Sequence, residues 1–413
     1  MKRLLFLAAL LAATAACEMM TAEENHKKKP DEVIIGEGEY LDCDPGIYVT
    51  AVTFDDGYDW QRDTAIGAIK GRIEVYKKDV LILSIPAGPE HEVSLDADKH
   101  HFIEGHLYTE YTTLSETVIK KDGNDFIRYE GTESLKGIVI RDEDFYTLGQ
   151  KTGGKGGFSL RKNGNPLMEK DNGVVWGSMA DPAYADTGAL YEDDGIMYFA
   201  YYSSHRDDAF PVERRWYLVK NQTVIEVWLE REVSDFYDLR MIHGQLCKLY
   251  SRSDEGGPIL EVDDHPYNLS NTISYRLSDD YRLLMYKNRP YFFGTFRYKQ
   301  NPPVCHTGVW NAGERYNAYK GKLMGIYVYG ETFVMVLRLD NGKLQLNYSF
   351  YNYGVDIPGN MLVSSPQCAA ISDRVIYIAL NGASAKEKPV LWTIGESYTY
   401  EINGFLTGVS VIK

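Results

Sequence analysis

Cysteine is scarce in this chain, and so are long apolar runs and helical periods. The 413 residues include 5 cysteines, none in a C-x-x-C or other zinc-ligand spacing, so a zinc knuckle is not expected. After the first 17 residues no stretch approaches 18 apolar residues, which predicts a soluble body without a transmembrane helix. No window in that body shows a convincing helical period over 12 residues, so an all-β class is favoured.

Motifs of common enzymes are missing as well. There is no G-x-S-x-G, so a serine nucleophile is not supported. The glycine-rich run 153–157 precedes a strand pattern rather than a helix, and it therefore lacks the helix dipole that would hold a phosphate. With 59 acidic residues, no carboxylate pair can be singled out for glycoside hydrolysis. We assign no catalytic residue and expect no cofactor.

Basic residues are too few to balance the acidic ones. The chain has 44 of the former and 59 of the latter, a formal net charge of −15 at pH 7. Because like charges repel, this balance argues against nucleic acid and against anionic membrane surfaces as partners.

The first residues determine the expected compartment. Lys2 and Arg3 precede a run of Leu, Phe and Ala over residues 4–13, and small residues follow as far as Cys17. The length and polarity of this stretch indicate a signal peptide over residues 1–16. Residues 14–17, Thr-Ala-Ala-Cys, resemble the lipobox of bacterial lipoproteins, although Thr14 stands where Leu is usual.

This resemblance implies that Cys17 becomes the diacylated first residue of the mature protein. We therefore expect an exported protein held at the bacterial cell envelope by its lipid alone, with the outer membrane favoured and the periplasmic or surface side left open. The alternative is an ordinary signal peptide with Cys17 incidental. Residues 17–42 lack an apolar period and are expected to form a flexible tether before one domain over residues 43–413.

One hairpin pattern recurs along the body: an apolar strand, a tight polar turn, and a second strand rich in β-branched and aromatic residues. It is found at residues 102–108, 138–146, 189–198, 239–247, 283–291, 325–333 and 370–377. A second hairpin follows most of these, at residues 117–126, 158–167, 216–225, 309–316 and 391–398. Two hairpins make a four-stranded unit at intervals of roughly 40 to 55 residues, which is the signature of a propeller blade.

The two ends of the body complete a further unit. Residues 405–412 resemble a first strand with nothing after it, residues 46–54 resemble a second strand with no first strand before it, and residues 72–83 continue that sheet. The pattern predicts an eight-bladed β-propeller of four-stranded antiparallel blades, closed by pairing of the C-terminal strand with the N-terminal partial blade. Seven blades is the second choice, because the outer hairpins near 239–280 and 325–360 are weak. Two tandem sandwiches explain the even spacing less well.

The chain thus resembles β-propellers as a fold over residues 43–413, without the Trp-Asp, kelch or Asp-box signatures of named repeat families. Such a resemblance carries no catalytic residue with it. It does imply where ligands would bind: on the face made by loops that lead into first strands and loops that join second to third strands.

The loop after residue 54 is the richest of these. It combines Asp56, Tyr58, Trp60, Arg62 and Asp63, and flat aromatic faces beside charged groups suit a sugar ring. Similar loops add the further candidates Tyr184, Asp186, His205, Arg206, Tyr237 and Tyr316. Taken singly, each segment is also explained as an ordinary solvated polar loop.

Histidines and cysteines leave two questions for the structure. Asp96, Asp98, His100, His101 and His106 could bind a divalent ion, but hairpin packing also accounts for them, and we assign no metal site. Four cysteines follow Cys17, namely Cys43, Cys247, Cys305 and Cys368, and they are either disulfide-bonded in an undetermined pairing or buried as free thiols.

The leading functional hypothesis is a lipid-anchored binding or scaffold protein rather than an enzyme, with a carbohydrate or other nutrient as ligand on the acidic, aromatic loops. One alternative is a glycan-active hydrolase or lyase that uses carboxylates near the central pocket. Another is a protein–protein scaffold, with an envelope protein as partner and no small ligand.

Overall fold

All regular structure in this protein is β-strand wherever the chain is described. The computed structural model describes residues 34–35, 40–54, 71–86, 100–113, 115–152, 156–175, 190–205, 213–229, 232–233, 235–242, 245–252, 258–268, 282–286, 289–297, 305–311, 314–329, 332–348, 353–359, 361–362, 369–382 and 387–413. Within these ranges no helix is long and apolar enough to cross a membrane.

The described strands form eight antiparallel sheets, the blades. Blades 1 and 2 consist of β35 (Gly404–Ile412), β2 (Gly46–Phe54), β3 (Gly71–Lys77) and β4 (Val80–Pro86), and of β5 (His100–Ile103), β6 (His106–Thr112), β7 (Glu116–Lys121) and β8 (Asn124–Glu130). Blades 3 and 4 consist of β9 (Glu133–Arg141), β10 (Asp144–Lys151), β11 (Gly157–Lys162) and β12 (Asn165–Asp171), and of β13 (Val174–Val175), β14 (Tyr191–Asp193), β15 (Ile196–His205), β16 (Glu213–Lys220) and β17 (Thr223–Leu229).

The second half of the ring repeats this plan. Blades 5 and 6 consist of β18 (Asp235–Ile242), β19 (Gln245–Ser251), β20 (Pro258–Val262) and β21 (His265–Asn268), and of β22 (Arg282–Tyr286), β23 (Arg289–Arg297), β24 (Cys305–Asn311) and β25 (Glu314–Lys320). Blades 7 and 8 consist of β26 (Lys322–Tyr329), β27 (Thr332–Arg338), β28 (Leu344–Tyr348) and β29 (Tyr353–Asp356), and of β30 (Met361–Leu362), β31 (Ala369–Ser372), β32 (Val375–Gly382), β33 (Val390–Thr393) and β34 (Glu396–Thr399).

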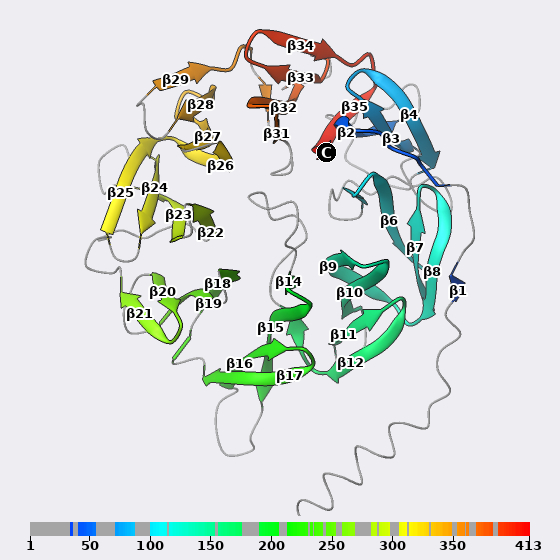
Figure 1. The fold of residues 1–413 in the computed structure, drawn as a ribbon, viewed down its shortest axis with the longest axis vertical. Coiled ribbons are helices and arrows are strands. Elements are labelled where there is room, and N and C mark those ends of the chain that lie inside the picture. Colours follow the sequence, from blue (N-terminus) through cyan, green and yellow to red (C-terminus); the bar gives the residue numbers. More distant parts are fainter. Residues whose placement is uncertain are drawn as a thin grey trace, which may run out of the picture.

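The eight blades stand around a central axis (Figure 1), which confirms the predicted eight-bladed β-propeller. In each blade the first strand lies nearest the axis and the fourth lies at the rim (Figure 1). The outer hairpins that were too weak to identify in the sequence are β20–β21 and β28–β29. Two of their strands, β21 and β29, have only four residues each, which explains the weak signal.

A repeated side-chain contact holds the outer hairpin of a blade to its second strand. In four blades the turn between the third and fourth strands begins with an Asp or Asn at positive φ: Asp122 (51°), Asn163 (49°), Asn221 (43°) and Asp263 (46°). Each side-chain Oδ1 accepts a hydrogen bond from a backbone N–H of the second strand, at Leu107, Phe145, Met197 and Leu246 respectively. Asp and Asn tolerate left-handed backbone better than other residues with side chains, so this one residue both forms the turn and fixes it.

The hydrophobic core lies between the blades rather than within any one of them. Eight clusters of buried side chains occur, and each joins residues of two neighbouring blades. Between blades 5 and 6, for example, Leu249 packs with Phe292 and Trp310, whose rings stack at 4.8 Å. A single four-stranded sheet cannot cover its own faces, so every blade depends on both of its neighbours for burial.

The ring is closed by β35, which pairs with β2 from Gly46↔Ile412 to Thr53↔Gly404. A side chain at Gly404 would place its Cβ 1.9 Å from the carbonyl oxygen of Val52, so only glycine fits where the two strands meet. Asn381 of blade 8 holds the backbone of Leu406 at both its oxygen (2.9 Å) and its nitrogen (2.7 Å).

Two details of the described residues bear on earlier expectations. Within the segment expected to be flexible, Ile34–Ile35 form β1, which pairs antiparallel with the rim strand β8. Cys43, Cys247 and Cys305 are free thiols, while Cys368 lies outside the described residues.

Deletion of residues 405–413 is expected to destabilise the whole ring. It removes Phe405, Leu406 and Val409, all at most 9% exposed, and burial of such side chains stabilises by about 1.5–3 kcal/mol each. The loss in unfolding free energy should therefore exceed about 5 kcal/mol, as measured by urea denaturation. Removal of the exposed Lys413 alone is the control and should leave the unfolding free energy unchanged. An unchanged midpoint for the longer deletion would contradict closure through β35.

Candidate functional site

The antiparallel pairing places the strand ends that flank the predicted ligand loops at one face of the disc. In every blade the start of the first strand lies beside the end of the second, as in the pairs Thr53↔Gly404 and Asp235↔Ser251. We call this side of the disc the loop face. Residues 55–70 connect β2 to β3 and residues 206–212 connect β15 to β16, so both segments begin and end at the loop face.

Eight of the predicted ligand-binding residues lie outside the described residues, and so does the lipidation candidate Cys17. These eight are Asp56, Tyr58, Trp60, Arg62, Asp63, Tyr184, Asp186 and Arg206. The described strands nevertheless show where the segments carrying them start and stop.

Residues 176–189, which include Tyr184 and Asp186, interrupt the innermost strand of blade 4. β13 and β14 flank this segment, and both pair with β15 on its axial side. Blade 8 is built in the same way, with β30 and β31 both pairing with β32. Figure 1 shows β14, the strand that follows this segment, close to the axis.

His205 and Tyr237 lie at the loop face. His205 is the last residue of β15 and pairs with Glu213, and Tyr237 lies at a bulge near the start of β18. The Tyr237 hydroxyl donates a hydrogen bond to Ser251 Oγ (3.2 Å), and its ring packs against the cluster between blades 5 and 6. Tyr237 therefore has a packing role whatever else it contacts.

Tyr316 lies at the other side of the disc. It falls at a bulge in β25, between the pairs Val309↔Asn317 and Trp310↔Arg315. This position is close to the turn from β24 to β25, and that turn is at the end of the blade opposite the loop face. The structure therefore separates Tyr316 from the strand ends that bracket the other candidates.

Among the residues considered for metal binding, His100 and His106 each have a protein partner, while Asp96 and Asp98 lie outside the described residues. His100 Nε2 shares a hydrogen bond of 2.8 Å with Thr407 Oγ1 of the closing strand, and His106 Nδ1 shares one of 2.8 Å with Asp122. Burial, with a smaller contribution from His101, lowers the pKa of His100 to about 3, so its ring is neutral at physiological pH. Packing explains both residues.

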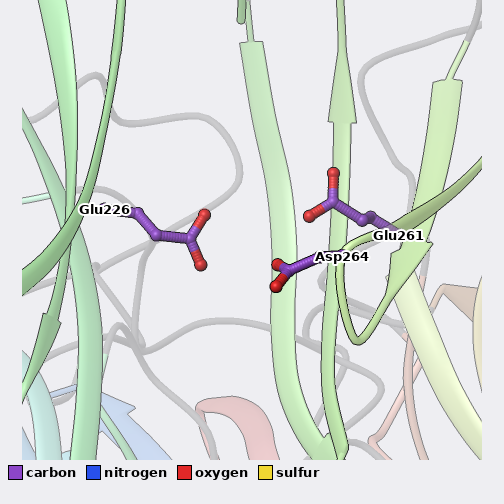
Figure 2. Close-up of side chains that lie close together, drawn as sticks. All are labelled: Glu226, Glu261 and Asp264. Atoms are coloured by element: carbon purple, nitrogen blue, oxygen red, sulfur yellow. The ribbon is translucent and has the colours of Figure 1, made fainter.

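A cluster of acidic side chains that the sequence analysis missed lies between blades 4 and 5. Figure 2 shows Glu226, Glu261 and Asp264 pointing toward one another from β17, β20 and the turn after β20. One oxygen from each lies within 4.8 Å of the others. Between them lies the Lys248 ammonium, whose Nζ is 2.7 Å from Glu226, 2.6 Å from Glu261 and 3.4 Å from Asp264.

Lys248 occupies the place that a cation would take. Its side chain is 1% exposed and its ammonium lies 5.4 Å from the centre of the Trp228 ring. Burial alone would lower the pKa of Lys248, but the hydrogen bonds with Glu226 and Glu261 outweigh it and raise that pKa. Burial raises the pKa of Glu226, against the opposing effect of Lys248.

This geometry is that of a buried ion pair between two blades. Carboxylate pairs in glycosidases lie about 5–10 Å apart with the substrate between them, whereas here the ammonium fills that space. The sequence does contain an indication of this ion pair, a single lysine inside the apolar strand β19. It does not show which of the 59 acidic residues would pair with that lysine.

A second buried ion pair lies in blade 3, against blade 2. Arg161 and Glu133 are each 2% exposed in their side chains and meet at 2.9 Å. The Arg161 guanidinium also lies 4.1 Å from the centre of the Tyr129 ring of β8. Charged groups buried in this way are costly unless fully paired, and both of these pairs lie against a neighbouring blade.

The ring of eight four-stranded blades defines the class to which the chain belongs, the β-propeller proteins. No family model matches the sequence, and no curated protein matches it. The structure is similar to that of dihydro-heme d1 dehydrogenase NirN in complex with DHE, with a TM-score of 0.52 and 9% identity over 91% of this chain and 77% of that chain.

Two other solved structures are similar over comparable lengths. One is apo AztD from Citrobacter koseri, with a TM-score of 0.46, 12% identity, and coverage of 89% of this chain and 98% of that one. The other is a putative 6-phosphogluconolactonase from Bacteroides fragilis, with a TM-score of 0.32, 10% identity and the same coverages of 89% and 98%. At these identities the likeness is one of fold alone.

The variant Lys248→Met is expected to lose about 3–5 kcal/mol of unfolding free energy at pH 7.5, because it leaves three carboxylates facing one another without their cation. Carboxyls with a raised pKa bind protons more readily in the folded state, so the variant should regain stability as the pH falls toward 5. Chemical denaturation at the two pH values measures both effects. Lys162→Met, which removes the surface pair with Asp144, is the matched control and should behave like the wild type at both.

Proposed function

We propose that this protein is a lipid-anchored binding protein of the bacterial cell envelope, with a carbohydrate as ligand on its loop face. The observation that carries this proposal is that residues 55–70 and 206–212 start and stop on one face of a closed ring. The aromatic, acidic and basic residues of these segments therefore belong to connections whose flanking strand ends share one face. Aromatic rings beside charged hydrogen-bonding groups are suited to sugars.

The N-terminal segment is attached to blade 2. β1 pairs with β8 at Ile127 and Arg128, and the Leu41 nitrogen donates a hydrogen bond to Asp122 (2.9 Å). If Cys17 carries the lipid, residues 18–33 connect it to β1, and such a segment spans at most roughly 60 Å when fully extended. The disc would then be held near the membrane by its rim at blade 2.

Binding without turnover is favoured over glycan cleavage by one observation. In the part of the chain that the structure describes, the close group of carboxylates is already filled by Lys248. A scaffold function without a small ligand is tested by the same experiments, since it predicts no glycan binding.

Replacement of Trp60 by Ala is expected to weaken glycan binding by about tenfold or more, because loss of a central aromatic contact commonly costs that much. The measurement is a glycan array followed by calorimetry with the best glycan found. Tyr267→Ala, an aromatic residue at the rim that is 39% exposed, is the control and should bind as the wild type does. An array without hits, or equal affinity of both variants, would count against the loop face as a sugar site.

The variant Cys17→Ser should be recovered from the soluble fraction of cells, because the thiol that would carry the lipid is gone. The wild type should be recovered with the membranes. Cell fractionation measures the membrane association of each protein, and metabolic labelling with a fatty acid measures its lipidation. Cys43→Ser is the matched control and should stay with the membranes. Continued membrane association of Cys17→Ser would rule out lipid anchoring at this residue.

A further inference from the structure

A cavity of about 380 Å³ lies on the flank of blade 8 that faces blade 7. Its size falls within the range of small-molecule sites in proteins. One wall comes from blade 8, through Leu380, Trp392 and Met361 of β30, and Pro358 is contributed by the segment that joins blade 7 to blade 8. The wall from blade 8 is continuous with the hydrophobic cluster between blades 7 and 8.

The lining is mainly apolar, through Pro358, Met361, Leu380, Val390 and Trp392. The ligand that suits these walls has an apolar ring or chain.

Thr393 supplies a polar group at the cavity wall. The residue is 4% exposed, and its Oγ1 has no hydrogen-bond partner among the described residues. Buried hydroxyl groups in proteins are nearly always hydrogen-bonded. The oxygen itself is inaccessible to water, so it lies behind the cavity surface and does not face a ligand.

Glu396 gives the site its charge. It lines the cavity at the start of β34 and accepts a hydrogen bond from the Tyr398 hydroxyl (2.9 Å), but no cation pairs with it among the residues that the structure describes. The protein as a whole carries a net charge of −15. A cationic group on the ligand is favoured and an anionic one is disfavoured.

We infer that this cavity is a binding site for a small apolar amine, whose ring or chain contacts Leu380 and Trp392 and whose ammonium faces Glu396. This site does not involve residues 55–70 or 206–212 and requires neither the anchor nor a glycan.

The test uses N-phenyl-1-naphthylamine, a neutral probe that fluoresces in apolar surroundings, with two competitors of like size and opposite charge. Tryptamine is expected to displace the probe from the full-length protein, and indole-3-propanoate is not. Glu396→Gln should weaken the binding of tryptamine about two- to fivefold, as expected for loss of an exposed ion pair, and leave the affinity for the probe unchanged.

A variant that fills the cavity tests whether the probe binds there. Ser397→Trp places a bulky ring at the cavity wall and should reduce probe affinity at least tenfold, whereas Thr223→Trp at the start of rim strand β17 in blade 4 should not. Equal probe affinity for the wild type and Ser397→Trp would overturn the site. Equal binding of the two competitors would contradict the role assigned to Glu396. If Ser397→Trp fails to fold, Glu396→Gln still tests that role, because it hardly changes the side-chain volume.

Discussion

A row of twisted sheets becomes a closed disc only when the last sheet is joined to the first, and here β35 makes that joint. The strand pairs with β2 along nearly its whole length, so blade 1 is built from both ends of the described chain. It also contributes to two gaps between blades, through Leu406 and Val409 toward blade 8 and through Ile412 toward blade 2. Since every cluster of the core lies in such a gap, closure determines whether each blade has two covered faces or one.

Polar contacts reinforce the same strand from both sides. Asn381 of blade 8 binds the backbone of Leu406, while Thr407 donates to Thr50 (2.9 Å) and meets His100 of blade 2. These groups are buried, and each has its partner on a different strand. Buried hydrogen bonds of this kind favour one register, because a shift of one residue would leave every member of the set unpaired.

Charged side chains are also buried between the blades. Lys248 and Arg161 are nearly inaccessible to water, and each lies among carboxylates and against an aromatic ring of the preceding blade. Such pairs contribute little net stability compared with apolar packing, but breaking one is costly. They therefore specify which blade faces which, in a molecule whose apolar gaps are otherwise alike. The cavity beside Trp392 lies next to one of these gaps, and its lining comes from blade 8 and from Pro358 in the segment before it.

The sequence by itself determined the all-β class, the four-stranded unit, the number of blades and the closing strand, because these depend on local alternation and on turns such as those at Asp122 and Asn163. The short strands β21 and β29 carried too little periodic signal to be seen. Only the tertiary structure decided which side chains meet across a gap: Lys248 with Glu226, Thr393 at a cavity wall, and Tyr316 at the side of the disc away from the loop face. Contacts between blades join residues whose relative position depends on the rotation and register of two sheets, and no local pattern encodes that geometry.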